Sequence, residues 1–73
     1  MMKCLNNKIR KIRLQKNITI KQLANEVGIS EKALRMYERG ERNPRIGNLV
    51  KIANILNVDL LYFYEIDNSI NII

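Results

Sequence analysis

The side chains best suited to chemistry lie between Glu31 and Arg39, where long polar and basic residues alternate with apolar ones. At about 100° per residue of an α-helix, Leu34 and Tyr37 fall on one side. The opposite arc, about 140° wide, carries five residues: Glu31, Lys32, Arg35, Met36 and Arg39. Basic side chains can donate to guanine O6 and N7 or to phosphate, and a glutamate can accept from cytosine. The segment predicts a helix packed from behind whose mostly basic front suits the DNA major groove, although an ordinary solvated helix face would look similar.

Charge is distributed unevenly along the 73 residues, which carry a net charge of +6. Residues 1–45 hold twelve basic and four acidic side chains, or +8, whereas residues 46–73 hold one basic and three acidic, or −2. A polyanion would therefore meet the N-terminal two-thirds of the chain. The alternative is a charged surface that serves only solubility.

The composition gives little support for catalysis, a cofactor or a metal site. Histidine is absent, Cys4 is the single cysteine, and the seven carboxylates are scattered. We expect no enzyme activity, because Cys4 has no visible base and no acid–base pair is evident. We expect a cytoplasmic protein, because a lone cysteine suits a reducing compartment and no segment reads as a signal peptide or a membrane span.

Apolar periodicity and capping residues predict five short helices in a single all-α domain over residues 1–73. The expected helices cover about residues 6–16, 20–27, 31–39 and 46–56, with a fifth beginning after Asp59. Thr19 and Gln22 form a possible capping box, Asn17 and Gly28 are expected helix stops, and Ser30 is an expected N-cap. The predicted core comprises Leu5, Ile9, Ile12, Leu23, Ala24, Val27, Leu34, Tyr37, Leu49, Ile52, Ala53, Leu56, Leu60, Phe63 and Tyr64.

Two of these helices join through a four-residue turn, Val27-Gly28-Ile29-Ser30, with the small Ala24 just before it. This arrangement is typical of a helix-turn-helix. Four blocks extend the pattern: IRKIRLQKNIT at 9–19, IKQLANEVGIS at 20–30, YERGERNP at 37–44 and LVKIANILNVDL at 49–60. In these blocks the chain resembles the phage-repressor and Cro-like helix-turn-helix proteins, often called the Xre family.

The resemblance covers about residues 9–64 and implies a compact five-helix, lambda-repressor-like DNA-binding domain. Its helix-turn-helix would span residues 20–39, with the second helix in the major groove. The implied base contacts are Glu31, Lys32, Arg35 and Met36. The implied DNA-backbone contacts are Thr19, Lys21, Arg39, Arg42, Asn43 and Arg45. Two positions depart from the family pattern: Ile20 replaces a polar residue, often Gln, and Arg45 replaces the usual cap of the fourth helix.

Arg13 and Glu38 match positions that form an ion pair in relatives. Such a pair would fix the first helix against the third, and removing one partner would strand a charge. Two independent surface charges are the alternative.

The resemblance also implies a homodimer on a palindromic operator. A single module that neutralises about four phosphates would show a salt slope of only about −3.6. The expected interface is the fifth helix with the tail, residues 65–73, through Leu61, Tyr62, Ile66, Ile70 and Ile72. The alternative is a tail that folds back over its own core.

The function that follows is a sequence-specific, double-stranded-DNA-binding transcriptional regulator acting as a repressor. A phage or mobile-element repressor, a restriction–modification controller and an antitoxin with a toxin partner all fit the residues. Three other classes are weaker alternatives: a protein-interaction module with the same fold, an RNA-binding protein, and a basic first helix lying on a membrane. The scarcity of exposed aromatic residues argues against RNA, and the apolar side of the first helix is better explained as core.

Overall fold

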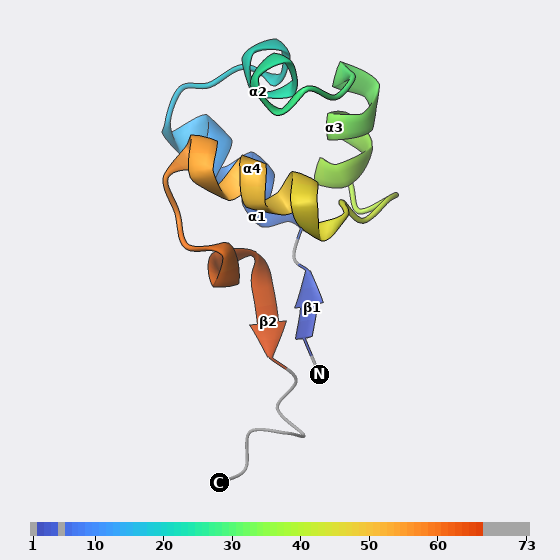
Figure 1. The fold of residues 1–73 in the computed structure, drawn as a ribbon, viewed down its shortest axis with the longest axis vertical. Helices are drawn as coiled ribbons and strands as arrows, with labels where there is room; N and C mark the ends of the chain where they lie inside the picture. The colour runs from blue at the N-terminus through green and yellow to red at the C-terminus, as the bar shows by residue number, and fades with distance from the viewer. Residues whose placement is uncertain (1, 5, 67–73) are drawn as a thin grey trace, which may run out of the picture.

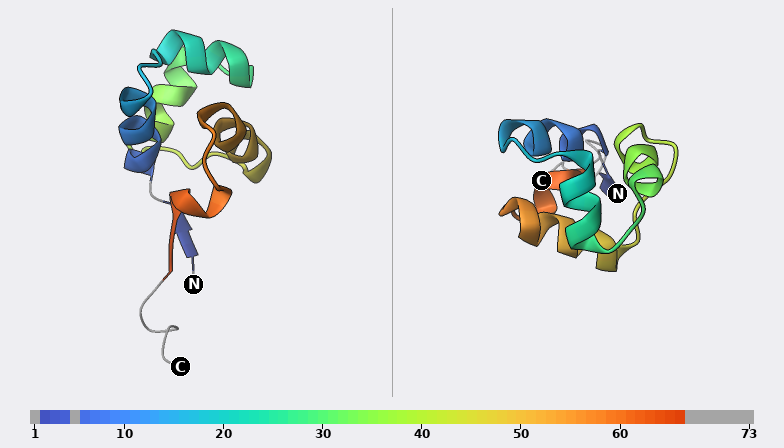
Figure 2. Two further views of the ribbon diagram at one scale, coloured as in Figure 1. Left: turned by 90° about the vertical axis from the view of Figure 1, so that its left-hand side faces the viewer. Right: turned by 90° about the horizontal axis from the view of Figure 1, so that it is seen from above.

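Helices form the body of the structure, and a pair of short strands lies at one end of it (Figure 1). This computed structural model describes residues 2–4 and 6–66, with side chains over residues 8–63. Its elements, in order, are β1 (Met2–Cys4), α1 (Asn6–Gln15), α2 (Ile20–Val27), α3 (Glu31–Glu38), α4 (Ile46–Leu56), the 3-10 helix η1 (Leu60–Phe63) and β2 (Tyr64–Ile66). Views at right angles place α2 at the end of the molecule opposite the strands (Figures 1 and 2).

The first helix boundaries follow from the capping residues. Asn17, two residues after the end of α1, takes the left-handed conformation, with φ 57°. Thr19 caps α2: its hydroxyl accepts from the Gln22 N–H at 3.0 Å, and the Gln22 side chain accepts from the Thr19 N–H at 2.9 Å. The predicted capping box is therefore confirmed. It satisfies two backbone donors that would otherwise have no partner inside the helix.

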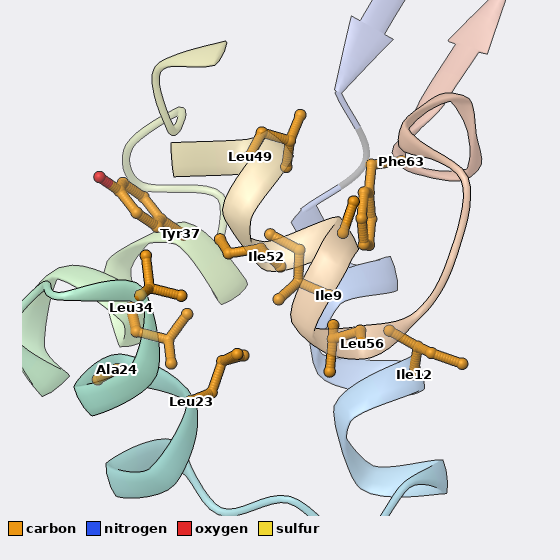
Figure 3. Packing of buried hydrophobic residues seen from close by; sticks show 12 residues of the cluster. Ile9, Ile12, Leu23, Ala24, Leu34, Tyr37, Leu49, Ile52, Leu56 and Phe63 are labelled. Carbon is orange, nitrogen blue, oxygen red and sulfur yellow. The ribbon is translucent and has the colours of Figure 1, made fainter. Parts of the chain in front are cut away.

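The hydrophobic core joins all the helices. Twelve buried residues form it (Figure 3): Ile9, Ile12, Leu23, Ala24, Val27, Leu34, Tyr37, Leu49, Ile52, Ala53, Leu56 and Phe63. Burying a side chain of the size of Leu or Ile contributes about 1.5–3 kcal/mol, so these contacts dominate the stability of the body. Leu60 is only partly buried, and Leu5 and the side chain of Tyr64 lie outside the described residues and side chains.

The prediction of a fifth α-helix is wrong. Asp59 does cap the segment, because its carboxylate accepts from the Leu61 N–H at 2.9 Å. However, the helix is a four-residue 3-10 turn, η1, that seats Phe63 in the core. The chain then becomes extended and forms β2.

The strand pair explains why the helix stops. β1 and β2 are antiparallel, with Met2 opposite Ile66 and Cys4 opposite Tyr64. This pairing joins residues sixty or more positions apart and takes the backbone hydrogen bonds that a longer helix would have used. The all-α prediction holds for the packed helices, and the strands add to it.

Candidate nucleic-acid interface

The turn between α2 and α3 is fixed by backbone geometry and by a cap. Gly28 has φ +88°, and its N–H donates to the Ala24 carbonyl at 2.9 Å. The Ile29 N–H donates to the same carbonyl at 3.0 Å. The Ser30 hydroxyl then accepts from the Ala33 N–H at 3.0 Å and starts α3. The two helices are therefore joined by a short turn that leaves little freedom in their relative orientation.

One side of α3 is buried and the other faces solvent. Leu34 and Tyr37 have exposed fractions of 0% and 4%, and both belong to the core cluster, with Tyr37 at its edge (Figure 3). On the opposite side Lys32, Arg35 and Arg39 are exposed, and Glu31 and Met36 are partly exposed. The side chains that would have to enter a groove are therefore not covered by other described segments.

An ion pair runs along the front of α3. Arg35 donates to a Glu31 carboxylate oxygen at 3.3 Å, one turn away, and both side chains are about half exposed. Such a pair contributes at most about 1 kcal/mol. It can exchange for contacts to bases at little cost, since both partners already extend along the surface.

A buried ion pair holds α3 against α1. The Arg13 guanidinium donates to both carboxylate oxygens of Glu38, at 2.7 and 3.0 Å, and to the Ile18 carbonyl at 2.8 Å. The two side chains are only 8% and 5% exposed. The expected pair is therefore present in its buried form. Because Arg13 also binds the loop before α2, it links three segments of the framework that positions α3.

Two hollows are each lined by residues from the first turn of α2 and by residues of α3. One is lined by Lys21, Gln22, Ala24, Asn25, Ile29, Ser30 and Glu31. The other is lined by Arg10, Arg13, Ile20, Arg35, Glu38 and Arg39. The structure thus brings Lys21 close to Glu31, and Ile20 close to the basic front of α3.

The comparison with known proteins agrees with this geometry. A family model of a helix-turn-helix, HTH_3, matches residues 9–63. The chain belongs to the HTH_3 helix-turn-helix family. In this family member the helix-turn-helix is α2, the turn and α3, within an all-α, lambda-repressor-like fold.

Three relatives illustrate the likeness. The chain is 39% identical over 57 residues to the uncharacterized HTH-type transcriptional regulator YqaE of Bacillus subtilis, covering 78% of this chain and 49% of that protein. It is 46% identical over 44 residues to the cryptic phage CTXphi transcriptional repressor RstR of Vibrio cholerae, covering 60% and 39%. The P22 c2 repressor, solved with a synthetic operator, superposes with a TM-score of 0.77 at 28% identity, covering 84% and 92%. The chain spans about half the length of the curated relatives that it matches.

The loop after α3 of this HTH_3 domain carries the other expected phosphate contacts. Arg42, Asn43 and Arg45 are all exposed. Arg39 is paired with Glu41 at 3.2 Å, again with both side chains largely in solvent. Arg45 occupies the N-cap position of α4 without a side-chain hydrogen bond to the helix. As expected, α4 therefore lacks the side-chain N-cap that is usual in the family. The Arg45 guanidinium remains available to a ligand.

The start of α2 shows the second departure. Ile20 is half-buried and packs against the core rather than offering a polar group. Thr19 and Lys21, the expected substitutes, are both exposed. The Thr19 hydroxyl oxygen already serves the cap, so only its hydrogen remains to donate to a phosphate.

Sequence reasoning missed Arg10. It is exposed on α1 and lines the same hollow as Arg35 and Arg39. Its position three residues before Arg13 was the available signal, since residues three apart share a helix face.

The residues expected at a dimer interface differ in how exposed they are, and some of them lie outside the described residues. Leu61 is 62% exposed. Tyr62 packs against the core, with the Lys8 ammonium 4.9 Å from its ring centre and Phe63 edge-on to it. The backbone of Ile66 lies in β2, whereas Ile70 and Ile72 lie outside the described residues.

The described residues form neither a membrane-spanning helix nor a group of metal ligands. No helix among them is both long enough and apolar enough to span a bilayer. Within the same residues, no three His, Cys, Asp or Glu side chains cluster in a way that could hold a metal ion.

Proposed function

We propose that this protein is a transcriptional regulator that binds double-stranded DNA sequence-specifically and acts as a repressor. In this proposal α3 enters the major groove, and Glu31, Lys32, Arg35 and Met36 contact base edges. The observation that carries the proposal is that one side of α3 is packed in the core while the opposite side, which is mostly basic, is exposed. Relatives named as regulators and repressors support it, as does the operator bound to the P22 c2 repressor.

The remaining polar and basic residues fit a role on the DNA backbone. The expected phosphate contacts are Thr19, Lys21, Arg39, Arg42, Asn43 and Arg45, all exposed in the structure. Contacts to phosphate position the protein on the duplex, while contacts to base edges provide sequence specificity. Most of these residues flank the base-contacting ones, because α3 lies between the start of α2 and the loop before α4 (Figure 1), whereas Arg39 lies on the same front as Arg35.

We also propose that two copies bind a palindromic operator. The exposed Leu61 lies on η1, next to the strands and away from α2 (Figure 1). Residues 46–73 carry a net charge of only −2, against +8 for residues 1–45, so two copies meeting there would repel each other less than two copies meeting through their basic parts. Contact at this end would leave the front of α3 open.

Selection of bound duplexes from a random pool tests this function. The expected winner is a palindrome whose half-sites lie about one helical turn apart, since each copy would place one α3 in the groove. Arg35→Ala should then relax the preference at one base position in each half-site. Arg42→Ala is the matched control, and it should weaken binding to all sequences about equally. A pool that yields no enriched sequence would contradict the proposal.

A further inference from the structure

The hollow between α1 and α3 has an excess of positive charge. Arg10, Arg13, Arg35 and Arg39 line it, against a single carboxylate, Glu38. Glu38 is fully engaged by Arg13 at 2.7 and 3.0 Å, so that buried pair is neutral as a unit. The charge left for a ligand comes from the other three guanidinium groups.

These three arginines differ in how they are held. Arg35 pairs with Glu31 at 3.3 Å and Arg39 with Glu41 at 3.2 Å, both on the surface. Arg10 is exposed, and within the described part of the chain it has no carboxylate partner. Its guanidinium is therefore free to take an anion without first leaving another group.

Besides the buried Arg13–Glu38 pair and the three other arginines, the hollow is lined by one apolar side chain. Ile20, the first residue of α2, lines it and also packs against the core. An anion arriving at the start of α2 would therefore be held by the flanking arginines. A guanidinium suits a tetrahedral oxyanion because it can donate two parallel hydrogen bonds to phosphate.

We propose that one phosphate of the DNA backbone binds in this hollow, held by Arg10 from α1 and by Arg39 at the end of α3. The inference rests on the proposed function, and it adds α1 to the DNA-binding surface. Arg39 reaches the phosphate by exchanging Glu41 for it. That exchange costs little, because an exposed pair is only weakly stabilising. The two arginines would then make the phosphate contact that a polar side chain at the position of Ile20 would otherwise make.

Salt titration of duplex binding tests this phosphate site. The duplex is the winner of the selection, and the variants are Arg10→Ala and its neighbour Lys11→Ala. Lys11 is an exposed cation on the same helix that does not line the hollow, so it is a matched control for charge. Arg10→Ala is expected to weaken binding about tenfold and to make the slope of log K against log salt shallower by about 0.9. Lys11→Ala should change both much less, and the melting temperature of each variant should match that of the parent.

A second measurement locates the phosphate. Single phosphates of the duplex are replaced in turn by neutral methylphosphonates, and each duplex is titrated with the parent and with Arg10→Ala. One position should weaken the parent clearly more than it weakens Arg10→Ala, because the variant has already lost the Arg10 share of that contact and keeps only the share of Arg39.

The outcomes separate the two proposals. A parent protein that binds no duplex contradicts the proposed function and the phosphate site with it. A parent that binds its selected duplex, with equal slopes for the two variants or no coupled phosphate, overturns the phosphate site alone.

Discussion

Removing Glu38 should destabilise the fold because it leaves the Arg13 guanidinium buried without its charge partner. The side chains of Arg13 and Glu38 are only 8% and 5% exposed. Breaking a buried pair in this way costs about 3–5 kcal/mol. A domain of this size has a free energy of unfolding of about 4–11 kcal/mol, so Glu38→Ala would take a large share of it. The melting temperature should fall by at least about 12 °C, at about 4–8 °C per kcal/mol for a small domain.

Arg13→Ala should be at least as damaging. It strands the Glu38 carboxylate and also removes the donor to the Ile18 carbonyl, a bond of 2.8 Å. Thermal unfolding followed by circular dichroism gives both melting temperatures. Duplex binding should be lost mainly through unfolding, and should return on cooling to where each variant is folded.

Two controls separate burial from charge alone. Glu41→Ala breaks the exposed pair with Arg39 and should cost less than about 1 kcal/mol. The double variant Arg13→Met with Glu38→Leu should recover much of the loss, because apolar residues of similar volume often replace a buried pair without net cost. Single variants that melt within about 2 °C of the parent would refute the reasoning.

Three further variants test individual caps and turns. Gly28→Ala should cost about 1–2 kcal/mol of unfolding free energy from backbone strain alone, because φ is +88° and nothing lies within 4 Å of the added Cβ. Thr19→Ala should cost about 1 kcal/mol by removing the capping box, again measured by thermal melting. Arg45→Ser should raise the melting temperature by supplying a cap to α4 while weakening duplex binding, and a variant that melts lower would contradict the role of this cap.

Local signals explain why four helices could be placed from the sequence. α2 begins and ends where the capping box and Gly28 predict, and α4 covers Ile46–Leu56 as expected. These signals work because a cap or a left-handed residue acts on backbone groups only a few positions away. The core positions follow from helical spacing for the same reason, as the burial of Leu34 and Tyr37 shows.

The last part of the chain could not be placed in this way. Leu60–Phe63 has the apolar residues of a helix, yet it forms a 3-10 turn followed by β2. The deciding contact is the pairing of Tyr64–Ile66 with Met2–Cys4. No local pattern shows that these two distant segments will pair, because the entropy cost of joining them is offset by contacts made elsewhere in the fold.

The candidate DNA-binding surface also has parts that local sequence predicts and parts that only helix packing determines. The sequence by itself determined the polar arc of α3 and the turn before it, because both depend on spacing along one or two helices. Only the tertiary structure decided that Arg10 lies in the same hollow as Arg35 and Arg39, and that the Arg13–Glu38 pair is buried. The physical reason is that burial and charge clustering arise where α1 packs against α3, and the packing of separate helices is set by the whole core.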